Sequence, residues 1–175
     1  MKMKAVAKFE KVSMEQFKRD MVKCFPSIYC VEDEVPTSLY ENLKLPRRAT
    51  KGSAGYDFFS PIPFCLLPGQ TITFPTGIRC KIDDGYVLKI YPRSGLGFKY
   101  RLQLNNTVGI IDSDYYNAKN EGHIMAKLTN DTNEGLPVNI KLGDALMQGV
   151  FVEYFIAYDD NATEERVGGL GSTSK

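Results

Sequence analysis

Short apolar runs, each closed by Gly, Pro or another turn residue, follow one another between residues 58 and 158. They read FFSPIPFCLLPG, QTITFPTGIRCKI, GYVLKIYPRSG, HIMAKLTN, LPVNIKLGD and ALMQGVFVEYFIAY. Short runs rich in β-branched and aromatic residues, with turn signals between them, are typical of closely spaced β-strands. No long helical pattern follows residue 42. The 175 residues are therefore predicted to form one all-β domain, built as a sandwich, a barrel or a jelly roll.

The first 44 residues have a different pattern and are predicted to be an extension. Residues 5–12 favour a short strand, and Ser13 with Gln16 three positions later has the form of a helix capping box. Apolar side chains then recur at helical spacing, at Met14, Phe17, Met21 and Val22. The pattern predicts an amphipathic helix over residues 13–24, ending before a proline. Its role stays open between a packing helix, a lid and a partner surface.

Composition excludes several classes of function. The chain has 22 Lys and Arg against 21 Asp and Glu, and this balance argues against a general nucleic-acid binder. No apolar run is long enough to span a bilayer or to serve as the core of a signal peptide, so a cytoplasmic protein is expected. With a single histidine, His123, and no C-x-x-C spacing, a zinc site is not predicted. The four cysteines are expected to be reduced and mostly buried.

Residues 105–116, NNTVGIIDSDYY, carry the strongest chemical signal in the chain. An apolar strand, interrupted by Gly109, leads into two carboxylates, Asp112 and Asp114. A glycine inside a strand indicates close approach of another backbone or a ligand. An Asp at the end of a buried strand is placed as a catalytic base would be, with rigid support behind it. The segment does not fit a calcium loop, because Asn117 stands where the glycine of that loop is required.

Five motifs occur in a fixed order. They are AGYDFFSP at residues 54–61, PRSGLG at 92–97, GIIDSDY at 109–115, GDALMQG at 143–149 and RVGGLGSTS at 166–174. This ordered set resembles the trimeric deoxyuridine triphosphatases (dUTPases) over residues 45–175. The resemblance implies a dUTPase-like jelly roll or β-barrel over residues 45–158. It also implies a mobile C-terminal arm over residues 159–175 and leaves residues 1–44 as the helical addition.

The resemblance implies hydrolysis of dUTP to dUMP and pyrophosphate, by attack of water at the α-phosphorus. Asp112 matches the family's catalytic base, and Tyr115 matches the tyrosine that packs under the deoxyribose and excludes a 2′-hydroxyl. Asn106 matches a position near the uracil, and Gly109, the first residue of GIIDSDY, is also expected to contact the substrate. The base-reading hairpin is expected in residues 115–122, where this chain carries a longer polar segment than usual.

The same resemblance implies how the triphosphate is held. Phosphate contacts are expected from PRSGLG and GDALMQG, through Arg93, Ser94, Gly95 and Gln148. From the arm they are expected through Arg166, Gly171 and Ser172. Leu170 stands where an aromatic residue usually stacks on uracil. Asp57 is expected to support Mg²⁺ through ordered water, the ion being held mainly by substrate phosphates. The resemblance also implies a homotrimer with active sites between subunits.

Two other functions remain open. A dCTP deaminase-like enzyme would share the fold, but GIIDSDY with a Gly-rich, Arg-bearing tail fits the hydrolase better. A nucleotide-responsive regulatory protein is the alternative from another class, with the N-terminal helix as the contact surface for its partner.

Overall fold

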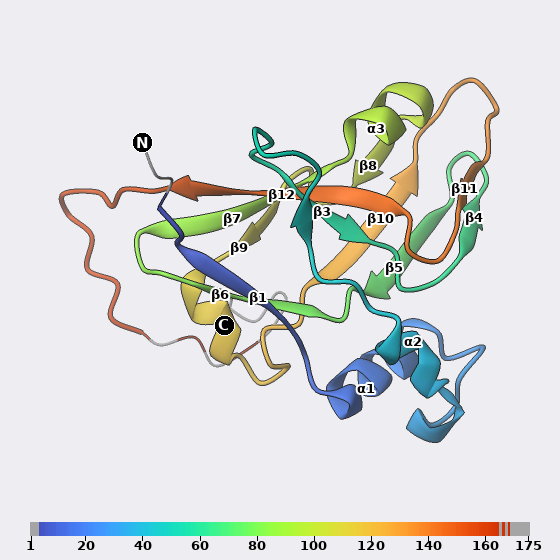
Figure 1. The fold of residues 1–175 in the computed structure, drawn as a ribbon, viewed down its shortest axis with the longest axis horizontal. Coiled ribbons are helices and arrows are strands. Elements are labelled where there is room, and N and C mark those ends of the chain that lie inside the picture. The colour runs from blue at the N-terminus through green and yellow to red at the C-terminus, as the bar shows by residue number, and fades with distance from the viewer. Residues whose placement is uncertain (1–3, 165, 167, 169–175) are drawn as a thin grey trace.

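The computed structural model describes residues 4–164, 166 and 168. Its regular structure is mainly antiparallel β-sheet, and two helices of the N-terminal extension lie together beside the sheets (Figure 1). The largest sheet has the order β2-β3-β12-β7-β9. Its strands are β2 (Arg47–Arg48), β3 (Tyr56–Phe59), β12 (Ala145–Glu153), β7 (Tyr86–Pro92) and β9 (Gly109–Ile111). This architecture confirms the all-β prediction and its jelly-roll-like form.

Three smaller sheets complete the β domain. One has three strands in the order β5-β10-β8: β5 (Thr71–Pro75), β10 (Met125–Asn130) and β8 (Leu102–Leu104). The other two are pairs: β4 (Phe64–Leu66) with β11 (Val138–Ile140), and β1 (Ala7–Lys11) with β6 (Ile78–Ile82). The extension therefore contributes a strand of its own to the β domain, since β1 pairs with β6 along its full length.

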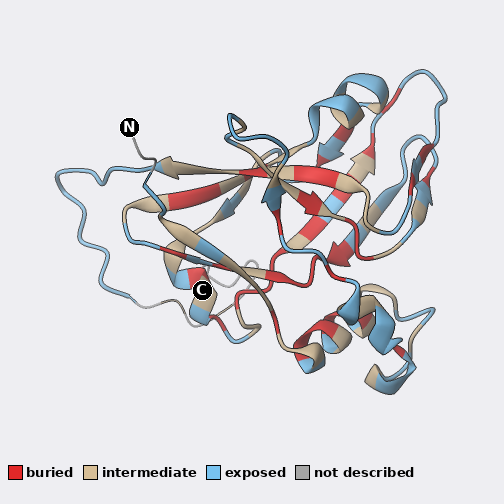
Figure 2. Ribbon diagram, in the orientation of Figure 1, coloured by how far each residue is buried: buried red, intermediate tan, exposed pale blue. Residues whose placement is uncertain are grey.

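The core lies between the sheets, where buried residues alternate with exposed ones along the strands (Figure 2). Gly149 on β12 shows how tightly it is packed. A Cβ there would lie 2.8 Å from a methyl of Leu88 and 2.9 Å from the ring of Phe58. Such distances are below normal carbon contacts, so a glycine lets β12 approach its neighbours at this point.

The extension has a second, smaller core. Helix α1 (Met14–Cys24) packs near β5, and a 3₁₀ turn η1 (Glu32–Glu34) leads to α2 (Thr37–Glu41). The apolar residues buried among these elements are Val12, Phe17, Met21, Val35 and Leu43. The predicted helix is confirmed, with Ser13 as its N-cap accepting the Gln16 N–H. Only half of the predicted capping box forms, because the Ser13 N–H donates instead to Glu121, 108 residues away.

Two short helical segments interrupt the strands after residue 42. PRSGLG opens helix α3 (Ser94–Tyr100), and Asp112 precedes the 3₁₀ segment η2 (Ser113–Asn117). Among the described residues, no helix combines the length and the apolar character that crossing a membrane requires.

The surface departs from one expectation. Cys80 is buried and Cys24 is partly buried, whereas Cys30 and Cys65 are exposed, so the prediction of mostly buried thiols is wrong for two of the four. Exposure follows from position: Cys30 lies in the connector after α1, and Cys65 lies on the two-stranded sheet with its side chain outward.

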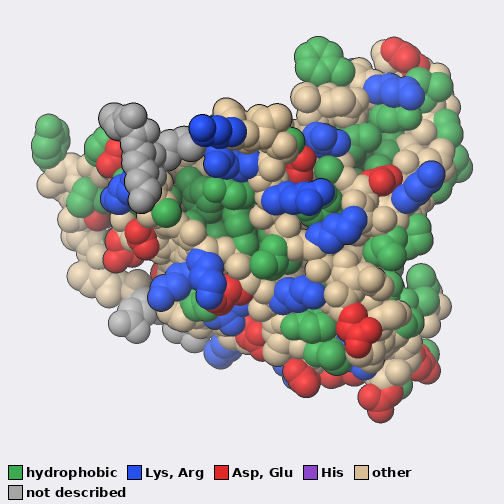
Figure 3. All heavy atoms as spheres, viewed as in Figure 1, with side chains coloured by type: hydrophobic (Ala, Val, Ile, Leu, Met, Phe, Trp, Pro, Cys, Tyr) green, Lys and Arg blue, Asp and Glu red, His purple; other side chains and the backbone are tan. Residues whose placement is uncertain are grey.

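On the face drawn in Figure 3, Lys and Arg side chains spread across the middle, between hydrophobic ones.

Candidate active site

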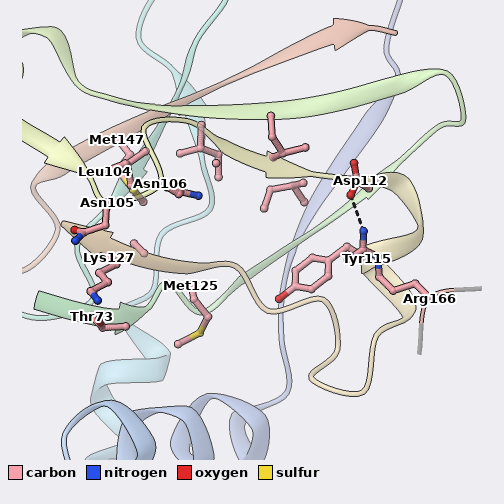
Figure 4. Close-up of a pocket in the computed structure, with 15 residues that line it drawn as sticks. Thr73, Leu104, Asn105, Asn106, Asp112, Tyr115, Met125, Lys127, Met147 and Arg166 are labelled. Carbon is pink, nitrogen blue, oxygen red and sulfur yellow. Dashed lines mark hydrogen bonds and ion pairs between the residues drawn. The ribbon is translucent and has the colours of Figure 1, made fainter. Parts of the chain in front are cut away.

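A cavity of about 580 Å³ opens beside β9, and its walls come from β7, β8, β9, β10 and η2. Its floor is apolar, with Ile90, Met125 and Met147 among the lining residues. Its polar side chains gather in two places (Figure 4). Asp112, Tyr115 and Arg166 lie at one end, and Asn105, Asn106 and Lys127 lie at the other. The cavity therefore offers an apolar centre with polar groups at both ends, as small-molecule sites commonly do.

Asp112 stands where β9 ends and η2 begins, as the sequence predicts. Its carboxylate is about half exposed and faces the cavity end. Arg166 approaches it from the C-terminal segment: Nη2 lies 2.6 Å from Asp112 Oδ2, and Nε lies 2.8 Å from Asp114 Oδ1. A single guanidinium thus spans both carboxylates of the motif. The chain reaches this position because it leaves the sheet after β12 and turns back toward η2 (Figure 1).

Tyr115 is buried in η2, and its ring lines the cavity. Its hydroxyl donates to the carbonyl oxygen of His123 at 2.8 Å and accepts from the Asn120 side-chain amide at 2.8 Å. Burial raises the pKa of the Tyr115 phenol, only partly opposed by the Asn120 hydrogen bond, so the hydroxyl remains a neutral donor. These two bonds fix the ring in one orientation. The Arg166 guanidinium lies 5.7 Å from its centroid.

The prediction of a β-hairpin at residues 115–122 is wrong. Residues up to Asn117 form η2, and the chain then turns sharply back onto it. Gly122 has φ +67°, and a Cβ there would lie 2.6 Å from the Tyr115 carbonyl oxygen and 2.7 Å from the Cα of Tyr116. With the chain packed this closely on η2, no pair of strands forms within these residues.

The cavity is instead lined by the turn that precedes Asp112. This turn joins β8 to β9, with Thr107 N–H donating to the Leu104 carbonyl at 2.9 Å and Val108 N–H donating to the Asn106 carbonyl at 2.7 Å. Asn106 lies in this turn, and Gly109 begins the strand after it. The close neighbour of Gly109 is a side chain, since a Cβ there would lie 3.2 Å from the Cβ of Ile90.

A second group of predicted residues lies elsewhere. Arg93, Ser94 and Gly95 line another hollow of about 490 Å³, bordered also by Asp144. Arg93 Nε lies 3.5 Å from Asp57 Oδ1. Gln148 is paired with Asp57 across β12 and β3. Gln148 also donates to the carbonyl of Pro92 at 3.4 Å. The phosphate-contacting residues predicted in PRSGLG and GDALMQG thus form one cluster with Asp57, the residue predicted to support magnesium, whereas Arg166 lies beside Asp112.

The two groups are far apart in one chain. Ile111, next to Asp112, pairs with Leu88 on β7, whereas Arg93 follows the opposite end of β7, five residues beyond Leu88. At about 3.3 Å per residue along a strand, these groups are separated by roughly 15–20 Å. A single chain therefore does not bring Asp112 together with Arg93, Ser94 and Gln148.

The dUTPase family model matches residues 41–174. The chain belongs to the dUTPase family. The deoxyuridine 5'-triphosphate nucleotidohydrolases of Lactococcus lactis subsp. lactis and Haemophilus influenzae are 41% and 42% identical to it over 139 residues. The alignments cover 77% and 75% of this chain and 91% and 87% of those proteins. The crystal structure of dUTPase from Streptococcus mutans is 38% identical, with a TM-score of 0.58, over 67% of this chain and 90% of that one. The dUTPase from phage phi11 of S. aureus is 26% identical, with a TM-score of 0.58, over 71% of this chain and 92% of that one.

A structural Mg(II) ion is described for a mutant of that phage dUTPase, which is 25% identical to this chain with a TM-score of 0.57 over 71% of this chain and 92% of that one. In the described part of the present dUTPase-family chain, no group of three or more His, Cys, Asp or Glu side chains could hold a metal. Asp57 is a single carboxylate beside Arg93, so it does not form a protein cage for an ion. A single carboxylate is suited to supporting an ion through water. Leu170, Gly171 and Ser172 lie outside the described residues.

Some residues around the cavity are given no individual role by the sequence motifs. Lys127 and Asn105 line its far end, and His123 and Asn120 hold Tyr115. Alternation along β10 predicts that Lys127 lies on one face of a strand, but it does not predict that this face borders the cavity. Nothing local distinguishes a supporting histidine from an ordinary buried one.

Proposed function

We propose that this protein hydrolyses dUTP to dUMP and pyrophosphate. The observation that carries the proposal is Asp112, a carboxylate at the end of a cavity whose wall holds Tyr115, in a chain of the dUTPase family. The cavity takes the uracil and deoxyribose, and the triphosphate extends from it past Asp112. The apolar floor suits a flat base, and the turn at residues 105–108 offers backbone and amide groups to its polar edge.

Asp112 acts as the general base. It accepts a proton from a water molecule while the water oxygen forms a bond to the α-phosphorus. The bond between the α-phosphorus and the bridging oxygen to the β-phosphorus breaks, and that oxygen leaves with pyrophosphate. The position of Asp112 at a strand end, with half of its carboxylate exposed, leaves room for water in front of it. The chemistry asks the protein mainly to orient the water and to stabilise charge.

The charge of the triphosphate is met by Arg93, Ser94, Gly95, Gln148 and Arg166. When bound, Mg²⁺ would neutralise phosphate charge, and Asp57 is the residue of this chain placed to support it through water. Arg166 is suited to phosphate because a planar guanidinium offers paired N–H donors. Tyr115 underlies the sugar and leaves no space for a 2′-hydroxyl, which selects deoxyribonucleotides.

The complete site forms between chains of a homotrimer. The separation along β7 supports this arrangement, because Asp112 and the Arg93 cluster cannot meet within one subunit. Exposed apolar side chains support it too: Phe155 and Ile156, just after β12, are 86% and 73% exposed. Adjacent apolar residues this exposed are typical of a surface that another chain covers.

Assembly is tested by light scattering and by mixing two inactive proteins. Asp112→Asn is combined with Arg93→Ala, which alters the group that another chain supplies, and mixed trimers should recover part of the activity because some sites receive both intact parts. A monomer with full activity would contradict the intersubunit arrangement.

The activity is tested by incubating the protein with Mg²⁺ and each of the dNTPs, dUTP and UTP. Pyrophosphate should appear with dUTP and only weakly with the others. Release of ammonia from dCTP would favour the deaminase alternative. Binding of dUTP without turnover would favour the regulatory alternative.

A further inference from the structure

The N-terminal extension is joined by side chains to the segment that follows Tyr115. The Glu121 carboxylate accepts from both the N–H and the hydroxyl of Ser13, at 2.7 and 2.6 Å. The Tyr116 hydroxyl donates to Glu10 on β1. All of these extension residues precede residue 41, where the match to the dUTPase family model begins. A part of the chain outside the family match thus holds the segment that directly follows the motif GIIDSDY.

The deepest of these links joins Asp20 of α1 to His123. The imidazole is fully buried, and its Nδ1 lies 2.7 Å from Asp20 Oδ2. Its Nε2 accepts the backbone N–H of Gly77 at 2.8 Å. A ring nitrogen that accepts an amide hydrogen bond carries no proton, so the proton of the neutral ring is on Nδ1 and is donated to Asp20. Both ring nitrogens are therefore occupied, and the ring cannot rotate.

Asp20 is an ionised partner. Burial alone would raise its pKa, but hydrogen bonds from His123 and Gln16 outweigh burial and hold the pKa below its ordinary value. The Gln16 amide donates to the same oxygen at 2.7 Å, and Lys23 Nζ lies 3.2 Å from the other oxygen. A buried carboxylate with this many donors is fixed in place, and it fixes the imidazole in turn.

The same histidine holds Tyr115. Its carbonyl oxygen accepts the Tyr115 hydroxyl at 2.8 Å. A continuous chain of hydrogen bonds therefore runs from α1 through Asp20 and His123 to the ring that lines the cavity.

We propose that Asp20 and His123 are positioning residues for sugar selection, and that the N-terminal extension acts as a brace that fixes the ring of Tyr115 against the deoxyribose. The proposal rests on the proposed dUTP hydrolysis. Loosening the brace lets the ring move away, which opens space for a 2′-hydroxyl and weakens the contact with deoxyribose. Chemistry at Asp112 is affected less, because the Asp112 carboxylate is bonded to Arg166 and is not a member of this chain of bonds. The hydrogen bond between Asp112 and Tyr115 joins their backbones and does not involve the carboxylate.

The test compares Asp20→Ala with Glu15→Ala, a matched control that removes an exposed carboxylate from the same helix. In Asp20→Ala, the preference for dUTP over UTP in kcat/KM should fall by about three- to ten-fold, in the lower part of the range of effects expected for coupled contacts. The KM for dUTP should rise while kcat changes little. Glu15→Ala should keep the wild-type preference.

A double-mutant cycle separates positioning from general stability. Tyr115→Phe removes the hydroxyl that bonds His123, and should also lower the preference. Combined with Asp20→Ala, it should add little, because both changes break the same chain of bonds. Additive losses, or an Asp20→Ala protein that loses thermal stability yet keeps the wild-type preference, would overturn the proposal. Wild-type protein without dUTP turnover would refute the proposed function instead.

A second measurement needs no variant. His123 is the only histidine in the chain, so its ring nitrogens give one set of signals in a ¹H–¹⁵N spectrum. The proton should be found on Nδ1 at pH 7, and a non-hydrolysable dUTP analogue should shift these signals more than the UTP analogue. A proton on Nε2, or equal responses to the two analogues, would contradict the brace whether or not Asp20→Ala folds.

Discussion

The Nη2 of Arg166 lies 2.6 Å from Oδ2 of Asp112, within one chain. Nε of the same guanidinium contacts Asp114, so one cation serves two carboxylates. Both carboxylates are about half exposed, and ion pairs in such surroundings contribute little net stability. The contact can therefore be exchanged for a stronger one. A triphosphate that reaches Asp112 presents more negative charge to the guanidinium than the two carboxylates do.

Arg166→Lys should behave almost like Arg166→Ala. Lysine keeps the charge but cannot donate from two fixed positions at once. Both variants should raise the KM for dUTP by about ten-fold, the scale of one charge-assisted hydrogen bond. Steady-state kinetics on the two proteins provide the measurement. A lysine variant with wild-type KM would show that charge alone, and not the geometry of the guanidinium, binds the substrate.

Asp112→Asn should lose turnover but keep binding. A positioned general base contributes about 10²–10⁴-fold, and its loss acts on the transition state. We expect kcat to fall within that range, with little change in the affinity for a non-hydrolysable dUTP analogue measured by calorimetry. Asp114→Asn is the matched control, since it changes the neighbouring carboxylate that Arg166 also contacts, and it should lose far less. A similar loss of kcat in both variants would assign the base role to the pair.

Much of this fold can be predicted from local patterns in the sequence. The helix at Met14–Cys24 follows from apolar spacing and an N-cap serine, and strands such as β7 and β12 follow from their apolar runs. The strand-end position of Asp112 follows from the pattern of GII before it. These features depend on neighbours within one or two turns of chain, so periodicity reveals them.

What the sequence does not reveal depends on distant partners. Ser13 is paired with Glu121 instead of being fully satisfied by its own capping box, and Asp20 meets a histidine 103 residues away. The turn after η2 folds back because Gly122 packs against the backbone of η2, and an insertion of polar residues gave no sign of that. Such contacts leave no periodic pattern, and a single sequence holds no record of which positions meet.

The four cysteines should divide into two classes by their reactivity toward a thiol reagent. Burial raises the pKa of the Cys24 thiol to about 11 and that of Cys80 to about 12, which leaves little reactive thiolate at pH 8. Cys30 and Cys65 are exposed. A thiol reagent at pH 8 should therefore label two cysteines quickly in the native protein and all four after denaturation, with peptide mapping to identify the sites. Rapid labelling of Cys80 in the native state would contradict its burial.

The brace should make stability depend on pH in the acid range. Burial would raise the pKa of Glu121, but hydrogen bonds from Ser13 and the charge of Arg79 outweigh it and hold the pKa below its ordinary value of 4.5. The pKa of Asp20 is likewise lowered from 3.8. Between the lowered pKa values of the folded protein and the ordinary values of the unfolded chain, the unfolded chain binds more protons than the folded one, so stability rises with pH. The contribution is complete above the ordinary pKa values and is lost as the pH falls through the folded ones.

Glu121→Gln tests this prediction because glutamine keeps the shape and one acceptor for Ser13 but cannot titrate. At pH 7 the variant should melt at a lower temperature than the wild type, since it lacks the charge that faces Arg79. The difference in Tm should then shrink as the pH is lowered from 6 toward about 3, where the wild-type carboxylate also becomes neutral. Circular dichroism melts at several pH values provide the measurement. Glu15→Gln, on the exposed face of α1, is the matched control and should follow the wild type throughout. A Tm difference between Glu121→Gln and wild type that stays constant over this range would mean that the Glu121 charge does not hold the extension to the β domain.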